Sequence, residues 1–377
     1  FIWRCCATLV AIVVILGSTG SIGKNTLALC EKFDISVEAL SCAKNVDLLN
    51  EQILKFKPKF VCVGDEKLAK NVKNVEAKNI FFGEAGLLEM LEISSSKKVI
   101  NALVGFAGLA PSLKTQALGK KLALANKESL VVGGKFLKTR EILPIDSEHF
   151  GLKFLLENKT PAKKLIITAS GGAFYKKPIK FLKDATPSDA LKHPNWDMGA
   201  KITIDSATMT NKLFEVMEAY WLYGIKDIEA VIEPTSAIHA VVEFIDGSST
   251  MHLSRTDMKL AIAHAIFEKV EQNIVSHANL LDLKNIKFQR ISLKKYPVFS
   301  LKDEVLASPD LGVVINAANE VGVFSFLEKK CSFLDISRLI LGSAKKFKSL
   351  KISSVDEIYE VDKEVREYAK RMLNAKV

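Results

Sequence analysis

The sequence has few cysteines and shows none of the spacings that cysteines adopt in zinc sites or disulfide frameworks. Its 377 residues include six cysteines, with no CxxC pair, and several of them fall within apolar runs. Such cysteines are typical of reduced thiols in a cytoplasmic protein, and they argue against a secreted disulfide-rich scaffold.

Long apolar runs, low-complexity tracts and fixed-period repeats are also missing. The most apolar stretch follows Arg4 in FIWRCCATLVAIVVILGSTG and leads directly into a glycine loop, without a small-residue cleavage site. At roughly a dozen residues it is too short to cross a membrane. We therefore expect a buried first strand here, preceded by an extension over residues 1–9, and no membrane partner.

Basic residues exceed acidic ones, with 53 lysines and arginines against 43 aspartates and glutamates and a net charge of +10. The lysines are dispersed through helical patterns such as KLAKNVKN and GSAKKFKSLK, and no basic stripe alternates with aromatic residues. This pattern argues against a nucleic-acid partner, whereas phosphorylated small molecules suit the same charge.

The chain is long enough for two or three domains. Residues 10–145 alternate amphipathic helical patterns with short apolar runs, and these runs predict strands over 11–16, 37–42, 59–64, 79–82, 98–103 and 121–126. This alternation is typical of an α/β domain with a parallel, doubly wound, Rossmann-like sheet.

The rest of the chain has a different pattern of apolar and polar residues. Residues 146–285 mix strands with helices and contain an Asp246-Gly247 hairpin signal, which predicts an α+β domain. Residues 286–310 are irregular and predict a linker. Residues 311–377 have helical periodicity throughout and predict a C-terminal helical domain.

A glycine loop, ILGSTGSIG, directly follows the first predicted strand and precedes a helical pattern. Gly17, Gly20 and Gly23 would let the backbone turn tightly and approach a pyrophosphate at the helix N-terminus. The spacing is GxxGxxG and not GxGxxG, so the strand before and the helix after support nucleotide binding over a simple tight turn.

The second predicted strand is followed by Ala43, Lys44 and Asn45, with no carboxylate. An NAD site uses an acid at this place to bind the ribose hydroxyls, whereas a lysine suits a 2′-phosphate. NADP(H) is therefore favoured over NAD. The alternative is that Lys44 is a solvated surface charge.

Acidic residues occur in an apolar setting in LPIDSEHFGL. In an extended backbone Asp146 and Glu148 would point to the same side, and Glu215 in TNKLFEVMEAYW offers a third carboxylate. Three oxygen ligands favour Mg²⁺ or Mn²⁺ over zinc. From the residues alone an alternative stands equally well: Asp146 caps a helix starting near Ser147, and Glu148 and His149 are solvated.

Further polar groups lie among apolar or small residues. They include NKES at 126–129, Ser170 before two glycines in TASGGAF, and HPNWDMG at 193–199, which could form a mobile lid. Taken singly, each is more often structural than functional. His239 lies in a strand-like run and is expected to be a core histidine.

Together these motifs resemble one family, the 1-deoxy-D-xylulose 5-phosphate reductoisomerases of the non-mevalonate isoprenoid pathway. The matching segments are GSTGSIG, ALANKES, PIDSEH, TASGG, HPNWDMGAKITIDSATMTNK with Glu215, and NAANE, in the family's order. The resemblance implies a homodimer that rearranges and reduces a phosphorylated sugar with NADPH and a divalent cation (Mg²⁺, Mn²⁺ or Co²⁺).

The resemblance also implies roles for individual residues. The metal ligands fall on Asp146, Glu148 and Glu215, which together with Lys127 and His193 are the expected catalytic residues. The expected substrate contacts, including those to phosphate, are Ser147, Glu148, Ser170, His193, Trp196, Ser206, Asn211, Lys212 and Glu215. The expected cofactor contacts are Thr19, Gly20, Ser21, Ile22, Ala43, Lys44, Asn45, Asn126, Lys127, Glu128, Met198 and Gly199. The sequence departs from the family where NKLFE replaces the usual NKGLE, placing Leu213 and Phe214 before Glu215.

Two other functions fit part of the pattern. A different NADP-dependent oxidoreductase, such as a semialdehyde dehydrogenase, would need a catalytic cysteine or a histidine–lysine pair after the nucleotide-binding half, and no three-acid metal site. A non-catalytic NADPH-sensing module would have no use for three converging carboxylates.

Overall fold

A computed structural model describes residues 12–157, 160–267, 269–279, 281, 283 and 286–375. The chain forms two compact units. The first comprises the chain up to Asn126 with the later segments Glu141–Ile145 and Met258–Ile274; the second comprises Lys127–Arg140, Asp146–Asp257 and the chain from Val275 onward. The extension predicted at residues 1–9 and the first residue of the strand predicted at 11–16 lie outside the described residues.

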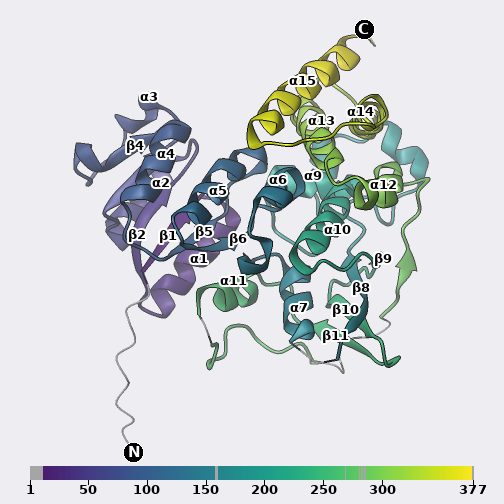
Figure 1. The fold of residues 1–377 in the computed structure, drawn as a ribbon, viewed down its shortest axis with the longest axis horizontal. Helices are drawn as coiled ribbons and strands as arrows, with labels where there is room; N and C mark the ends of the chain where they lie inside the picture. Colours follow the sequence, from purple (N-terminus) through teal and green to yellow (C-terminus); the bar gives the residue numbers. More distant parts are fainter. Residues whose placement is uncertain are drawn as a thin grey trace, which may run out of the picture. The chain divides into compact units, whose positions relative to one another are not determined.

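The first unit is built on a seven-stranded parallel sheet, which confirms the predicted α/β fold (Figure 1). Its strands are β1 (Ile12–Leu16), β2 (Ser36–Ser41), β3 (Phe60–Val63), β4 (Ile80–Phe82), β5 (Lys98–Asn101), β6 (Lys121–Leu124) and β7 (Leu143–Pro144). The strand order β4-β3-β2-β1-β5-β6-β7 changes direction between β1 and β5. Sheets of this kind bind ligands outside the carboxyl ends of the strands at that switch point. The six predicted strands form, and the short β7 was not predicted.

Helices cover both faces of this sheet. Helices α1 (Ser21–Lys32), α2 (Val46–Phe56) and α11 (Lys259–Ile266) lie on one face, and α4 (Gly83–Ile93) and α5 (Leu109–Ala117) lie on the other. Leu29, Leu49 and Ile262 are buried in the first layer, and Met90 and Leu91 in the second. Because both faces of each strand are covered, the strands are continuous apolar runs.

The second unit contains a five-stranded mixed sheet in the order β11-β10-β8-β9-β12. Its strands are β8 (Ala162–Ala169), β9 (Ile228–Ile232), β10 (Ile238–Phe244), β11 (Ser249–Leu253) and β12 (Gln289–Arg290). The antiparallel pair β10–β11 confirms the hairpin predicted at Asp246-Gly247. Gly247 has a φ of +89°, which explains why glycine is needed in this turn.

Helices form the rest of the second unit. They include α6 (Lys127–Gly133), α7 (Ser147–Leu156), α9 (Ala200–Thr208), α10 (Thr210–Tyr223), α12 (Lys302–Ala307), α13 (Leu311–Leu327), α14 (Phe333–Lys346) and α15 (Val355–Asn374). Helix α13 is buried along almost its whole length and packs against α6, α9, α14 and α15. The last three helices confirm the predicted helical character of the C-terminal region.

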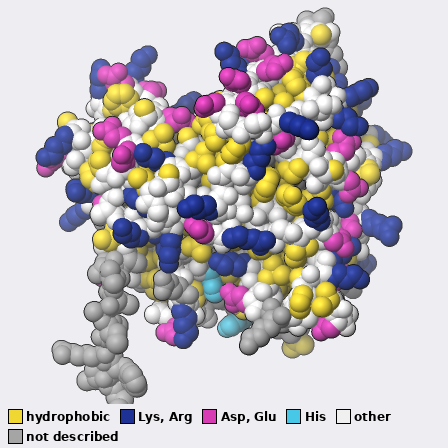
Figure 2. All heavy atoms as spheres, viewed as in Figure 1, with side chains coloured by type: hydrophobic (Ala, Val, Ile, Leu, Met, Phe, Trp, Pro, Cys, Tyr) yellow, Lys and Arg dark blue, Asp and Glu magenta, His cyan; other side chains and the backbone are white. Residues whose placement is uncertain are grey.

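Charged side chains are dispersed over the visible face of the molecule, as the sequence pattern indicated (Figure 2). Figure 2 shows lysines and arginines spread over the visible face among acidic and apolar side chains. Within the described parts of the chain, no helix combines the length and the apolar character needed to cross a membrane.

Candidate active site

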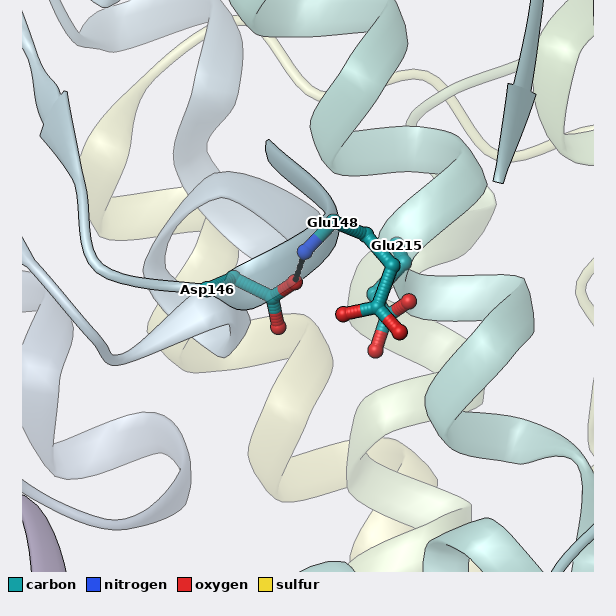
Figure 3. A group of neighbouring side chains, drawn as sticks. All are labelled: Asp146, Glu148 and Glu215. Carbon is teal, nitrogen blue, oxygen red and sulfur yellow. Dashed lines mark hydrogen bonds between the residues drawn. The ribbon is translucent and has the colours of Figure 1, made fainter. Parts of the chain in front are cut away.

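Asp146, Glu148 and Glu215 form a compact group of carboxylates in the second unit (Figure 3). One oxygen from each residue lies within 4.8 Å of the corresponding oxygens of the other two. Asp146 and Glu148 come from the start of α7, and Glu215 comes from α10. Three carboxylate oxygens at this spacing are a donor set that suits a hard divalent cation such as Mg²⁺ or Mn²⁺. The residues present therefore fit a metal ion.

The start of α7 brings the first two acids together. Asp146 has an extended backbone and accepts a hydrogen bond from the backbone N–H of Glu148 at 3.1 Å. Since the helix begins at Ser147, the expectation that an extended backbone would align the two acids is wrong; the helix cap does so. For Asp146 both interpretations left open by the sequence are correct, because this residue caps the helix and also belongs to the carboxylate group. The part of the second interpretation that placed Glu148 and His149 in solvent is wrong, because His149 is fully buried and the Glu148 side chain is only 16% exposed.

Two buried lysines partly neutralise the carboxylates. Lys127 Nζ donates to Asp146 Oδ2 at 2.7 Å and to Glu215 Oε1 at 2.8 Å. Lys212 Nζ lies 3.1 Å from Glu148 Oε1 and also bonds Glu215. When all three carboxyls are ionised, the group carries one more negative than positive charge, and in a buried site that excess favours a bound cation.

Other expected ligand contacts surround the same carboxylates. The amide of Asn211 donates to Glu215 Oε1, and Ser147 Oγ donates to Glu148 Oε2 at 2.6 Å. Leu213 and Phe214, where the sequence departs from the family pattern, are fully buried in the core. The bulkier pair therefore leaves Glu215 in contact with both lysines.

The cluster perturbs the titration of its acids. Burial raises the pKa of Glu148 to about 8. The nearby charges of Glu215 and Asp146 also raise this pKa, whereas the positive charge of Lys212 lowers it. At Asp146 burial also favours the neutral acid, but Lys127, His149 and Lys212 outweigh it and hold the pKa below its ordinary value. Glu148 is therefore the carboxyl that must lose a proton when a metal binds.

We predict that divalent metal affinity depends on pH through Glu148. Below a pH of about 8 the carboxyl is mostly protonated, so binding a cation must release this proton and affinity should rise with pH, levelling off above that value. Calorimetric Mg²⁺ titrations in two buffers of different ionisation enthalpy would count the protons released near neutral pH. A dissociation constant that does not change between pH 6 and 9 would contradict this assignment.

A second buried pair lies behind the carboxylates, and sequence reasoning assigned it no role. His149 Nε2 lies 3.1 Å from Glu218 Oε2, and Tyr223 donates to the backbone carbonyl of His149 at 2.5 Å. Burial opposes the charge of His149, but Glu218 outweighs it and raises the pKa of the imidazole. The sequence did contain a signal, because Glu218 follows Glu215 by three residues and so lies on the same side of α10.

The segment predicted as a lid contacts Ser170. His193 Nε2 lies 2.9 Å from Ser170 Oγ, and His193 Nδ1 accepts the backbone N–H groups of Asn195 and Trp196 at 3.2 and 3.0 Å. Because Nδ1 is an acceptor, the neutral ring carries its proton on Nε2 and donates to the serine. Burial lowers the pKa of His193 to about 4, which keeps the ring neutral at physiological pH.

Ser170 is left with a proton to donate to a ligand. Its oxygen accepts hydrogen bonds from His193 Nε2 and, at 3.1 Å, from the backbone N–H of Gly172. These two bonds occupy the lone pairs of the oxygen, so the hydroxyl proton is available to a ligand. Gly172 has a φ of +69°, and a Cβ there would come within 2.7 Å of the Ser206 carbonyl oxygen. The backbone of Gly172, two residues after Ser170, therefore packs closely against the end of α9 that carries Ser206.

The other expected residues of the segment 193–199 are Trp196, Met198 and Gly199. Trp196 packs edge-on against His239, with ring centroids 6.2 Å apart, and His239 Nε2 lies 3.3 Å from the Ser254 carbonyl, which confirms a core histidine. Met198 is half-buried, and Gly199 is exposed and precedes α9.

The glycine loop has the geometry of a phosphate-binding turn in the first unit. Gly17 has a φ of +81°, and a Cβ at Gly23 would come within 2.4 Å of the Gly17 carbonyl oxygen, so both positions require glycine. Gly20 precedes α1 without any side-chain cap, which leaves the N–H groups of the first turn for an anion. Thr19, Ser21 and Ile22 are half-buried around this turn, and the residues present fit a dinucleotide.

Ser18 stands where the standard fingerprint has a glycine, and the structure explains the replacement. Its hydroxyl donates to Gln52 Oε1 at 2.7 Å, and the Gln52 amide donates back to the Ser18 carbonyl at 3.0 Å. Gln52 lies on α2 and was not identified from the sequence. The pair holds the loop against the layer that covers β2.

The residues after β2 are accessible to a ligand or to solvent. Ala43, Lys44 and Asn45 are all exposed, and Asn45 caps α2 by accepting the Leu48 N–H at 3.2 Å. Asn126 is buried and its amide donates to the carbonyls of Leu103 and Gly105 at 2.9 and 2.8 Å. Asn126 therefore fixes the loop after β5 at the switch point.

Models of one protein family match the chain in three segments. The descriptions are 1-deoxy-D-xylulose 5-phosphate reductoisomerase for residues 13–134, its C-terminal domain for residues 142–223, and DXP reductoisomerase C-terminal domain for residues 253–368. Reductoisomerases of this name from Campylobacter curvus and Campylobacter hominis are 69% and 61% identical; the matches cover 97% and 96% of this chain, and 100% and 99% of the relatives.

Solved structures agree with the sequence comparisons. A DOX-P reductoisomerase in complex with NADPH, fosmidomycin and magnesium is 33% identical with a TM-score of 0.88, and the match covers 96% of this chain and 98% of the other. The Zymomonas mobilis enzyme in complex with NADPH is 32% identical with a TM-score of 0.85 and has the same coverage.

Proposed function

This chain belongs to the 1-deoxy-D-xylulose 5-phosphate reductoisomerase family, and we propose that Asp146, Glu148 and Glu215 hold its catalytic divalent cation. The reaction is the metal-dependent rearrangement and NADPH-dependent reduction of 1-deoxy-D-xylulose 5-phosphate to 2-C-methyl-D-erythritol 4-phosphate, in non-mevalonate isoprenoid biosynthesis. The convergence of three carboxylates within 4.8 Å supports the proposed ligands most strongly. Neither a semialdehyde dehydrogenase nor a sensing module accounts for this group.

The chain's own residues prepare the reaction at the carboxylates. A bound divalent cation supplies Lewis-acid stabilisation of charge on substrate oxygens, and bound NADPH supplies the hydride. Lys127 orients Asp146 and Glu215 through its two short hydrogen bonds. Lys212 is held 3.1 Å from Glu148, where it can turn from the carboxylates toward a substrate phosphate.

Ser170, Ser206, Asn211 and Lys212 are the proposed phosphate ligands. Ser170 has a proton to donate because His193 and Gly172 fill its acceptor positions. Binding energy from the phosphate, remote from the reacting carbons, can position the substrate for the chemical step. We propose that His193, Trp196 and Met198 close over the substrate and exclude water from the reacting groups.

For the cofactor, we propose that the turn Thr19–Ile22 binds the NADPH pyrophosphate and that Ala43, Lys44 and Asn45 surround its 2′-phosphate. Asn126, Lys127, Glu128, Met198 and Gly199 are the proposed contacts on the nicotinamide side. An uncapped helix N-terminus in the turn and an exposed lysine after β2 support this placement.

We predict that Lys44→Ala raises the KM for NADPH by about 10-fold or more, because a charge-assisted bond to the 2′-phosphate is lost. The KM for NADH should change by less than about twofold, since NADH lacks that phosphate. Initial rates with both cofactors measure the ratio. Lys97→Ala is the matched control, because Lys97 is exposed and precedes the amino end of β5. Equal effects on the KM values of both cofactors would show that Lys44 does not bind the 2′-phosphate.

The experiment that tests the proposed function follows NADPH absorbance in the presence of 1-deoxy-D-xylulose 5-phosphate. Treatment with EDTA should abolish turnover, and adding back Mg²⁺, Mn²⁺ or Co²⁺ should restore it. Turnover that survives complete removal of the metal would overturn the metal-dependent mechanism.

We further propose a cytoplasmic homodimer with domains in the predicted order: a cofactor domain at 10–145, a catalytic domain at 146–285, a linker at 286–310 and a helical domain at 311–377. The compact units differ from these bounds, because Lys127–Arg140 belongs to the second unit and Met258–Ile274 to the first, and the predicted linker contains β12 and α12. Strand β11 is an edge of its sheet, and the exposed side chains of Ile245 and Met251 in its hairpin support pairing with a second copy. The buried free thiols of Cys30, Cys42 and Cys62 support a reducing compartment.

A further inference from the structure

A second buried group of charges is centred on Lys201, the second residue of α9. The side chain of Lys201 is 4% exposed, and its Nζ lies 2.6 Å from Glu128 Oε1 and 2.7 Å from Asp205 Oδ2. The Asn319 amide donates to the other oxygen of Asp205 at 2.8 Å. The group therefore joins α6, α9 and α13, and sequence reasoning gave Lys201 and Asp205 no role.

Lys201 and Glu128 favour their ionised forms despite their burial. Burial opposes the charge of Lys201, but Asp205, Glu128 and Glu320 outweigh it and hold the lysine pKa above its ordinary value. Burial likewise opposes ionisation of Glu128, but Lys201 outweighs it and lowers the carboxyl pKa. Buried ion pairs of this kind contribute little net stability, since desolvation offsets their attraction, but they can fix the geometry of the groups they join.

This group of charges includes a residue of the first turn of α6, the turn that also carries Lys127. Glu128 is adjacent to Lys127 in the first turn of α6, and Lys127 reaches Asp146 and Glu215. Helices α6 and α9 each pack against α10 and α13, and the contact between Lys201 and Glu128 is a direct side-chain tie between them. A Glu128 carboxylate without Lys201 would be a buried charge lacking its main cation, and it would shift or take up a proton.

We propose that Lys201 is a positioning residue, which fixes the first turn of α6 and thereby the contact of Lys127 with the metal-binding carboxylates. This role rests on the proposed metal site. It acts through Glu128 and does not require Lys201 to touch the substrate, the cofactor or the metal.

The first test is Lys201→Met, measured by Mn²⁺ titration followed by electron paramagnetic resonance, without NADPH or substrate. Loss of a group that orients metal ligands weakens metal affinity by about 10-fold to 100-fold, and we expect a dissociation constant raised within that range. In the assay kcat should fall by about 10-fold or more, while the KM for 1-deoxy-D-xylulose 5-phosphate changes by less than about threefold. Lys201→Arg retains the charge and should restore most of the Mn²⁺ affinity.

Lys135→Met is the matched control. Lys135 also forms a partly buried ion pair in this unit, 2.7 Å from Asp310, but it has no contact with Glu128 or Lys201 among its described partners. It should lower the melting temperature and leave the Mn²⁺ dissociation constant within about twofold of the wild type. A purely structural role for Lys201 would give the same result as this control.

Glu128→Gln breaks the same contact from the other side with an isosteric residue, so the test does not depend on the folding of Lys201→Met. We expect a similar loss of Mn²⁺ affinity, and a double variant no weaker than the more affected single variant, because both changes remove one interaction. Wild-type Mn²⁺ affinity in either folded single variant, or additive losses in the double variant, would overturn the positioning role. A wild-type protein that binds no Mn²⁺ would overturn the metal site itself, and with it this inference.

Discussion

Glu148→Gln will lower kcat by at least about 1,000-fold, because a metal ligand that supports several kcal/mol of transition-state stabilisation is lost. The amide retains the size of the side chain but is a neutral and weaker ligand for Mg²⁺ or Mn²⁺. Glu148 also faces Lys212 at 3.1 Å, and the amide cannot balance that charge. The NADPH-binding turn belongs to the first compact unit, so cofactor binding should persist. Stopped assays of NADPH oxidation and NADPH fluorescence titrations measure the two effects separately.

Glu157→Gln is the matched control for this substitution. Glu157 is exposed at the C-terminal end of the same helix, α7, so the variant makes the same chemical change away from the carboxylate group. It should retain wild-type kcat. Normal turnover by Glu148→Gln would show that Glu148 is not a metal ligand, and loss of NADPH binding in the same variant would show that the protein is misfolded.

Lys212→Met should lower kcat/KM for 1-deoxy-D-xylulose 5-phosphate by about 100-fold, mostly through KM. A charge-assisted bond from lysine to phosphate contributes roughly 1.5–3 kcal/mol, which is about 10-fold to 100-fold in binding, and the phosphate also loses its main positive partner. Lys212 is only 4% exposed and bonds two of the three carboxylates, so removing it also leaves the metal-free cluster more negative. The variant should therefore be destabilised without metal and recover its melting temperature when Mg²⁺ is added.

Two comparisons separate these contributions. Lys226→Met makes the same change at an exposed position just after α10 and should leave kcat/KM unchanged. Lys212→Arg restores the charge in a different shape and should recover part of the loss. If kcat falls and KM stays constant in Lys212→Met, the lysine acts on the chemical step and not on the phosphate.

The parallel sheet could be predicted because its strands are buried on both faces. Continuous apolar runs such as Ile12–Leu16 and Phe60–Val63 carry this information locally, and the glycines of the loop after β1 mark where the backbone must turn. The two-residue strand β7 could not be predicted, because it is defined by pairing with β6 and has no periodicity of its own. The same holds for α11, whose place beside α1 depends on packing between distant segments.

The sequence alone predicted the metal site only in part. Asp146 and Glu148 are close in sequence, but their juxtaposition with Glu215 depends on the packing of α7 and α10, and spacing alone left a helix cap equally plausible. The residues offered Glu215 as a third carboxylate, and the family resemblance then favoured the metal site over the helix cap. The pairs His149–Glu218 and Lys201–Glu128 join residues 69 and 73 positions apart. The helical spacing of Glu215 and Glu218 places Glu218 on the side of α10 that carries Glu215, but neither spacing nor motif order indicates the partner of Glu218 or the pair Lys201–Glu128.

The most direct test of the central claim is an Mn²⁺ titration of the wild type and of Glu148→Gln, followed by electron paramagnetic resonance near pH 8. The geometry predicts one Mn²⁺ site per chain in the wild type, with affinity reduced by at least about 100-fold in the variant. Equal Mn²⁺ affinity in the two folded proteins would contradict a metal site formed by Asp146, Glu148 and Glu215.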